Sequence, residues 1–391
     1  MIEEKFLFNG LDPLILFKSK LGMEETLSDQ GILVDSLLSA LGYGQVDGPV
    51  LEPTLPMRVR LSEGSTALVV VGCGGTGSHL VPTLFQFLAS KKLTEPSWNV
   101  PDLFLIDGDR VEESNLVRQK FTRSDLGKNK AEALAERYST IWGLNIFHID
   151  QYIEPGSLEK ILSGNSTGRM KYQSVIILGA VDNHLARAAI WDFYMKKPQA
   201  KYPGWENIFW IDAGNESNYG QAILSGKPSR KNVNYSDRSI NWRNAKIGDE
   251  IRLIELPTFF DHFPEELINL GNKGPARPGC VALAEIDPQT IQANMMSAFC
   301  ATSLCMQLFK GLITNTFIYF DSDSGSTKST ILSRNQIIKN NVLMTRSRNQ
   351  LNDFFKAINQ IGLQADDVDS AWLNTPYAKA LNASVFQGAE S

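Results

Sequence analysis

The residues best suited to chemistry lie between positions 72 and 130, where a group of glycines precedes acidic, amide and basic side chains. The glycines Gly72, Gly74, Gly75 and Gly77 follow a β-branched run and precede an apolar segment of helical length. Glycines at such a strand-to-helix turn let the backbone approach a phosphate, and the first turn of the helix offers unpaired N–H groups. The pattern predicts a nucleotide site, although binders of NAD, FAD and ATP share it.

The polar side chains after the glycines discriminate between these nucleotides. They comprise two carboxylates, two amides and two cations: Asp107, Asp109, Asn115, Gln119, Arg118 and Lys130. A carboxylate after the second strand can bond ribose hydroxyls in any dinucleotide fold. Cationic donors stabilise the negative charge that develops when pyrophosphate leaves ATP, and nicotinamide chemistry has no such requirement. The set therefore predicts an ATP site.

In their order, the motifs GxGGxG, D-x-D, S-N-L-x-R-Q and G-x-x-K resemble those of the ThiF/MoeB and ubiquitin-activating enzyme superfamily, over residues 67–330. The resemblance implies adenylation of the C-terminal carboxylate of a ubiquitin-like protein. It places the ribose on Asp107 and the phosphates on Asn115, Arg118 and Lys130, with support from Gln119. Asp109 and the four glycines complete the nucleotide-binding set, and Asp182 resembles the aspartate that holds magnesium and ATP.

Asp182 also has a structural alternative. It follows a predicted strand over 174–180, at the carboxyl edge where doubly wound folds bind ligands. It also precedes a predicted helix over 183–195, where an aspartate can serve as N-cap. Spacing alone weighs the two roles equally, and the resemblance favours the ligand role. Magnesium is expected only as the ATP complex.

Cys280 ends a polar stretch, residues 226–280, which resembles the crossover loop that covers the ubiquitin-like tail in related enzymes. A free cysteine is most often a small buried hydrophobe. A thiol beside an acyl-adenylate could instead accept the acyl group as a thioester. We favour the thioester role, with a structural role and sulfur transfer as alternatives. Cys300 and Cys305 lie in an apolar helix and are expected in the core. Because the sequence has no C-x-x-C pair, a structural zinc is not expected.

Alternating strand and helix patterns predict an α/β fold, with a doubly wound, Rossmann-like, mostly parallel sheet. We expect a helical segment and linker over 1–66, the adenylation domain over 67–332, and a helical extension over 333–391 that contains a helix closed by Gly362. Strands are expected at 68–71, 104–106, 145–149, 174–180, 208–213, 219–225, 316–321 and 329–332. Helices are expected at 78–90, 128–142, 157–162, 183–195 and 291–312.

Composition limits the functional classes. The 38 basic and 43 acidic residues give a net charge of −5, which argues against a general nucleic-acid binder. No apolar run approaches the ~20 residues of a membrane span, and the N-terminus does not resemble a signal peptide, so a cytoplasmic protein is expected. The compact layout resembles bacterial members of ubiquitin-like conjugation systems.

The resemblance also implies partners: a ubiquitin-like protein ending in glycine, a conjugating enzyme that accepts the thioester, and a second copy in a homodimer. Three alternatives to this function stay open. They are adenylation of a sulfur-carrier protein or a peptide, a non-catalytic scaffold that pairs with an active homologue, and an NAD-dependent oxidoreductase.

Overall fold

A computed structural model describes residues 54–61, 65–163, 172–195, 207–228, 251–252, 254–269 and 290–360. All of them belong to the compact unit Pro53–Ser391, and a second unit comprises Met1–Glu52. Residues 1–53 of the expected N-terminal segment therefore lie outside the described residues, as do Cys280 and Gly362. Among the described helices, none combines the length and apolarity needed to cross a membrane.

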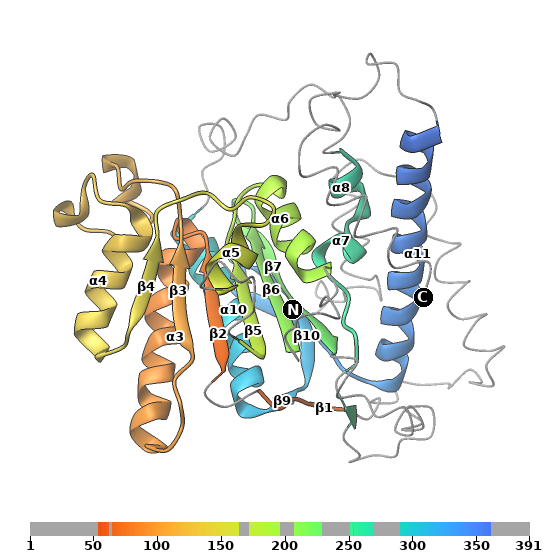
Figure 1. The fold of residues 1–391 in the computed structure, drawn as a ribbon, viewed down its shortest axis with the longest axis horizontal. Helices are drawn as coiled ribbons and strands as arrows, with labels where there is room; N and C mark the ends of the chain where they lie inside the picture. The colour runs from red at the N-terminus through yellow and green to blue at the C-terminus, as the bar shows by residue number, and fades with distance from the viewer. Residues whose placement is uncertain are drawn as a thin grey trace, which may run out of the picture. The chain divides into compact units, whose positions relative to one another are not determined.

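An eight-stranded sheet runs through the unit in the order β11-β10-β7-β6-β5-β2-β3-β4 (Figure 1). Its strands are β2 (Thr66–Val71), β3 (Asp102–Ile106), β4 (Ile146–Ile149), β5 (Ser174–Gly179), β6 (Asn207–Asn215), β7 (Tyr219–Pro228), β10 (Asn315–Asp321) and β11 (Ser326–Ile331). Strands β4, β3, β2, β5 and β6 pair in parallel, whereas β7, β10 and β11 extend the sheet antiparallel. Every residue of β2 and β5 is buried, as expected for central strands covered on both faces.

Helices cover both faces of this sheet, which confirms the predicted doubly wound α/β fold. The helices are α3 (Gly75–Thr94), α4 (Lys130–Trp142), α5 (Ser157–Ser163), α6 (His184–Met195) and α10 (Ile291–Lys310). α3 packs against α4 and α10 on one face, and α5 and α6 pack on the other. Because β2 turns directly into α3, the helix N-terminus lies at the carboxyl edge of the sheet, next to the ends of β3 and β5.

Residues 54–61 belong to the core of this unit, although their place in the sequence groups them with the N-terminal segment. Leu55, Met57 and Val59 are buried in the main hydrophobic cluster. The strand β1 (Met57–Arg58) pairs in parallel with β8 (Ile251–Arg252) and antiparallel with β9 (Leu312–Ile313). A hydrophobic pattern this short gives little indication of such pairing, because both partners lie far away in the sequence.

The long polar connection after β7 contains ordered elements in its described part. Besides β8, it contains the short helices α7 (Phe259–His262) and α8 (Pro264–Asn269). β7 also continues to Pro228, beyond the expected end at residue 225. The expected loop of residues 226–280 is thus partly regular structure.

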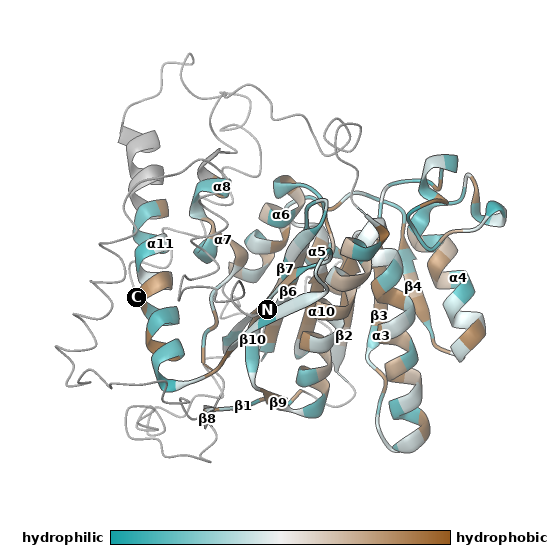
Figure 2. Ribbon diagram, turned by 180° about the vertical axis from the view of Figure 1, so that it is seen from behind, coloured by the Kyte–Doolittle hydropathy of each residue, from teal (hydrophilic) through white to brown (hydrophobic). Residues whose placement is uncertain are grey.

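The C-terminal helix is longer than the sequence suggests. α11 (Arg334–Gln360) begins three residues after β11 ends, and its first half is rich in asparagine, lysine and arginine. Figure 2 shows much of α11 in the teal of hydrophilic residues. Its buried contacts in this half come from only a few side chains, including Ile337, Ile338 and Met344. This sparse stripe is why the helical pattern is evident only near its C-terminal end.

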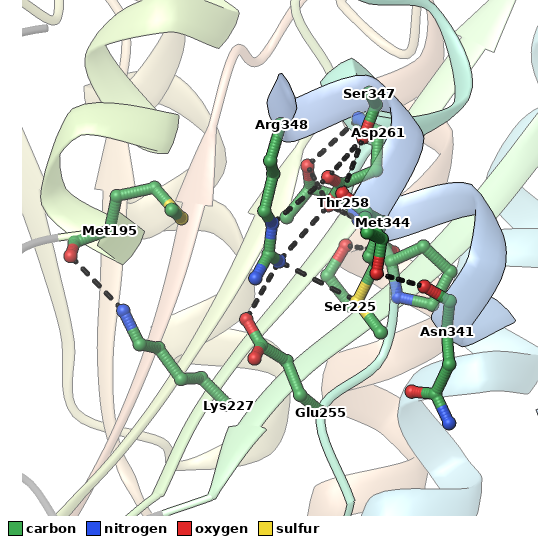
Figure 3. A network of polar contacts seen from close by, with 12 residues as sticks. Met195, Ser225, Lys227, Glu255, Thr258, Asp261, Asn341, Met344, Ser347 and Arg348 are labelled. Carbon is green, nitrogen blue, oxygen red and sulfur yellow. Dashed lines mark hydrogen bonds and ion pairs between the residues drawn. The ribbon is translucent and has the colours of Figure 1, made fainter. Parts of the chain in front are cut away.

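A buried polar network attaches α11 to α7 (Figure 3). Asp261 caps α7 by accepting the Thr258 backbone N–H at 2.8 Å. The same carboxylate accepts bonds from the Ser347 hydroxyl at 2.8 Å and from Arg348 Nε at 3.2 Å. Arg348 also donates to Glu255 Oε1 at 2.7 Å. One arginine of α11 therefore joins two acidic side chains of the connection that follows β7.

Candidate functional site

The glycine turn joins β2 to α3 under tight steric constraints. Gly72 has φ of +89°, and a Cβ built on it would overlap the backbone oxygen of Ala180. A Cβ on Gly77 would overlap the backbone oxygen of Gly72. A Cβ on Gly75, the first residue of α3, would meet the Asn294 side chain at 2.7 Å. These three positions exclude side chains because other parts of the protein occupy the space.

Gly74 differs, because the space beside it is open. The nearest atom to a Cβ built there is Gln119 Nε2, at 3.9 Å. The Oε1 atom of Gln119 is buried and has no hydrogen-bond partner among the residues that the structure describes. An unsatisfied buried amide beside a helix N-terminus suits a ligand that brings polar atoms into this turn.

Asp107, directly after β3, is hydrogen-bonded to the glycine turn. Its carboxylate accepts the backbone N–H of Cys73 at 2.6 Å and that of Asp109 at 2.8 Å. Burial raises the pKa of Asp107, and these two N–H groups only partly offset the effect. Since each carboxylate oxygen has a further lone pair, Asp107 can still accept ribose hydroxyls.

Asp109 and Lys130 form an ion pair instead of two separate ligand groups. Lys130 Nζ lies 2.9 Å from Asp109 Oδ2, and the Tyr152 hydroxyl donates to Asp109 Oδ1 at 2.5 Å. Burial raises the pKa of Asp109, but the bonds from Lys130 and Tyr152 outweigh it and hold the pKa below its ordinary value. The bond to Asp109 raises the pKa of Tyr152 to about 12, so its hydroxyl stays protonated.

Asn129 organises this acidic turn, and its position in the sequence offers little reason to select it. Its side chain is buried and donates to the backbone oxygens of Asp107 and Asp109, at 2.7 and 3.1 Å, and to Asp150 at 3.0 Å. Its Oδ1 caps α4 by accepting the Glu132 N–H at 3.1 Å. The only sequence signal for this role of Asn129 is that a polar residue stands immediately before a helix.

The segment 115–120 packs on the first turn of α3. Asn115 is buried, with Oδ1 accepting the Glu112 N–H at 2.9 Å, and Lys120 N–H donates to Ser78 Oγ at 3.0 Å. Arg118, between them, is half-buried, and its guanidinium makes no ion pair with any residue that the structure describes. A cation thus lies in the segment attached to the glycine turn without an anionic partner from the described chain.

Asp182 is exposed just beyond β5, at the same carboxyl edge. The capping alternative belongs to its neighbour, because Ala186 N–H donates to Asn183 Oδ1 at 2.8 Å and α6 begins at His184. Asp182 Oδ1 accepts a bond from Asn183 Nδ2 at 3.2 Å. The charge of Asp182 contributes, as the smallest of several causes, to the raised pKa of Tyr152.

A buried ion pair joins α6 to β6, and nothing in the sequence indicates it. Arg187 Nε lies 3.0 Å from Asp212 Oδ2, and both side chains are almost completely buried. The Arg187 guanidinium also lies 4.8 Å from the ring centroid of Phe259. The pair connects the helix after Asp182 to β6, and only the sheet order brings the two residues together.

The cysteines in the described part of the chain are unsuited to nucleophilic chemistry. Cys73, Cys300 and Cys305 are buried, and burial raises the pKa of each thiol. This confirms the expectation that Cys300 and Cys305 belong to the core.

No cluster of three or more His, Cys, Asp or Glu side chains among the described residues could hold a metal ion. A single exposed carboxylate such as that of Asp182 is compatible with magnesium that arrives bound to ATP, because Mg²⁺ commonly uses one or two carboxylates and phosphate oxygens.

Comparison with known proteins agrees with the motifs. The sequence profile of the ThiF family matches residues 60–254. The adenylyltransferase and sulfurtransferase UBA4 of Yarrowia lipolytica is 33% identical over 94 residues, 24% of this chain and 21% of UBA4. The chain thus spans about a fifth of that relative.

Solved structures that match part of this chain include E. coli MccB with ATP and E. coli TcdA with AMP. MccB is 16% identical with a TM-score of 0.41, over 70% of this chain and 65% of MccB. TcdA is 17% identical with a TM-score of 0.34, over 63% of this chain and 86% of TcdA. On its motifs and the profile match, this chain contains a ThiF-family domain over residues 60–254.

Proposed function

We propose that this protein activates the C-terminal carboxylate of a small protein by adenylation with ATP and magnesium. The observation that carries the proposal is Arg118, a half-buried cation that has no anionic partner in the described chain and lies in the segment bonded to the glycine turn. Lys130 is already neutralised by Asp109. A site with one uncompensated cation beside a helix N-terminus favours a polyanionic ligand.

The reaction follows from these side chains. The substrate carboxylate is ionised near neutral pH, so no general base is needed for its attack on the α-phosphorus. The bond to pyrophosphate breaks as the acyl–phosphate bond forms, and Arg118 stabilises the charge on the departing pyrophosphate. Asp107 holds the ribose, and Asp182 holds magnesium, which would neutralise phosphate charge.

A ubiquitin-like protein with a C-terminal glycine is the proposed substrate. A sulfur-carrier protein is the second candidate, supported by the similarity to UBA4, which is named both adenylyltransferase and sulfurtransferase. For the ubiquitin-like route we propose that the Cys280 thiolate attacks the acyl-adenylate carbonyl, forming a thioester and releasing AMP. Its place at the end of the stretch that resembles the crossover loop supports this role, and the other three cysteines are buried. Transfer to a conjugating enzyme and assembly as a homodimer remain part of the proposal.

ATP–pyrophosphate exchange tests the adenylation step. The wild type, Asp182→Ala and Cys280→Ala would be assayed with and without Gly-tailed candidate proteins. We expect exchange that requires the candidate protein, disappears in Asp182→Ala and persists in Cys280→Ala. A chain that does not bind ATP would contradict the proposal, and NADH-dependent absorbance changes would instead support the oxidoreductase. ATP binding without exchange by any candidate would favour the scaffold.

A further inference from the structure

Tyr152 is an exposed aromatic residue fixed beside the acidic turn after β3. It is 68% exposed, although its hydroxyl is bonded to Asp109 and its ring covers Gly108. A Cβ built on Gly108 would lie 2.7 to 2.8 Å from three adjacent atoms of the ring. These nearly equal distances show that the ring presents one face to Gly108. The rest of the ring is open to solvent.

The backbone around Tyr152 is held firmly. After β4 the chain turns at once, with Gln151 N–H donating to the Ile149 carbonyl at 3.1 Å. Asp150 accepts the Asn129 amide at 3.0 Å, and Ile153 is buried. An exposed ring with anchored neighbours on both sides loses little conformational entropy when a ligand covers it.

The neighbours of Tyr152 are the residues proposed to hold the sugar and magnesium. Its hydroxyl lies 2.5 Å from Asp109, and the charges of Asp107 and Asp182 both act on it. Asp107 directly follows β3 and Tyr152 follows β4, the next strand of the sheet, so both lie at the same carboxyl edge. A nucleobase is one glycosidic bond away from its ribose, which places it near any side chain that borders the ribose carboxylate.

We infer that Tyr152 binds the nucleobase of ATP by stacking its ring against it. This rests on the proposed function, because it presumes that Asp107 holds the ribose. An aromatic ring offers a π-face on which any base can stack. Tyr152 therefore sets affinity for the nucleoside part of ATP, whereas the glycine turn and Arg118 set affinity for its phosphates.

The alternative is that Tyr152 acts only through Asp109 and Lys130. Tyr152→Phe separates the two roles, because it keeps the ring and removes the hydroxyl. Tripolyphosphate is the matched ligand, since it has the phosphates of ATP and lacks the base. Phe147→Ala is the control variant, because Phe147 is a nearby exposed aromatic residue, in β4 and 41% exposed, which stacks on Phe104 instead of the acidic turn.

Calorimetric binding of Mg·ATP and Mg·tripolyphosphate to the full-length wild type and these variants tests the inference. Tyr152→Ala should weaken ATP binding about tenfold or more and leave tripolyphosphate binding unchanged. Tyr152→Phe and Phe147→Ala should bind both ligands as the wild type does. The inference is overturned if Tyr152→Ala binds ATP normally, if tripolyphosphate binding falls in parallel, or if Tyr152→Phe is as defective as Tyr152→Ala. A wild type that binds neither ligand would overturn the proposed function as well.

Discussion

The contact between Gly75 and Asn294 predicts a specific pattern of rescue. A Cβ at position 75 would lie 2.7 Å from Asn294 Oδ1 and 2.9 Å from Nδ2. Asn294 is fully buried in α10, and its Oδ1 accepts the Asn215 amide at 3.2 Å, so its side chain has little room to move. Gly75→Ala should therefore strain the junction between α3 and α10.

The size of the effect follows from two opposing terms. Overpacking a well-filled core costs about 1–3 kcal/mol. Alanine stabilises a helix by about 0.5–1 kcal/mol relative to glycine, which offsets part of that cost. Gly75→Ala should thus lower the free energy of unfolding by about 1 kcal/mol, and by no more than about 2.5 kcal/mol. Asn294→Ala alone removes one hydrogen bond and should cost about 1 kcal/mol.

The double variant should be more stable than the sum of these costs predicts, because Asn294→Ala removes the amide that the new methyl group would meet. Urea unfolding of the wild type, both single variants and the double variant would measure a coupling energy of about 1–3 kcal/mol. Gly77→Ala is the control, because its Cβ would overlap the backbone oxygen of Gly72 and no side-chain truncation can relieve that contact. Strictly additive costs for Gly75→Ala and Asn294→Ala would refute the reasoning.

Three further predictions concern charged and capping groups. Asn183→Ala should destabilise the protein by about 1 kcal/mol in urea unfolding through loss of the α6 cap, whereas Asp182→Ala should change stability by less than about 0.5 kcal/mol and still abolish exchange. Because the folded-state pKa of Asp109 is lowered, its ion pair stabilises the folded state at pH values above the ordinary pKa near 3.8. This stabilisation is lost as the pH falls through the folded-state pKa. The stability difference between wild type and Asp109→Asn, from urea unfolding at pH values on both sides of 3.8, should therefore shrink at low pH. Asp212→Ala should lower the free energy of unfolding by about 3–5 kcal/mol, because it leaves the buried Arg187 unpaired.

Each of these predictions has an outcome that contradicts it. Equal stability losses for Asp182→Ala and Asn183→Ala would indicate that Asp182 also caps the N-terminus of α6. A stability difference for Asp109→Asn that does not change with pH would show that its ion pair contributes nothing. If Asp212→Ala is no worse than the apolar pair Arg187→Met with Asp212→Leu, burial of an unpaired charge is not the cause.

The sequence predicts the elements that carry strong local signals. The β-branched runs of β2 and β5 are buried throughout, and the glycine turn lies where the motif places it. Helix α3 starts at Gly75 rather than at residue 78, because glycines within the motif adopt helical geometry. The predicted nucleotide residues Asp107, Asn115, Gln119 and Lys130 also lie at this turn or in segments bonded to it.

The contacts that the sequence could not predict join segments far apart in the chain. Tyr152 reaches Asp109 across 43 positions, and Asn294 reaches Asn215 across 79. Such pairs depend on strand order and helix packing, which local periodicity does not encode. Lys130 likewise has the charge expected of a phosphate ligand, and only the structure shows it paired with an acid.

The most direct test of the central claim is the fate of the α-phosphate. The Cys280→Ala variant, in which the proposed transfer that releases AMP cannot occur, would be incubated with Mg·ATP radiolabelled at the α- or the γ-phosphorus, together with a Gly-tailed candidate protein, and the acyl-adenylate isolated in acid. We expect the candidate protein to carry label from the α-phosphorus only, while the γ-label leaves as pyrophosphate. Label from the γ-phosphorus on the protein would show phosphoryl transfer instead of adenylation and would contradict the account.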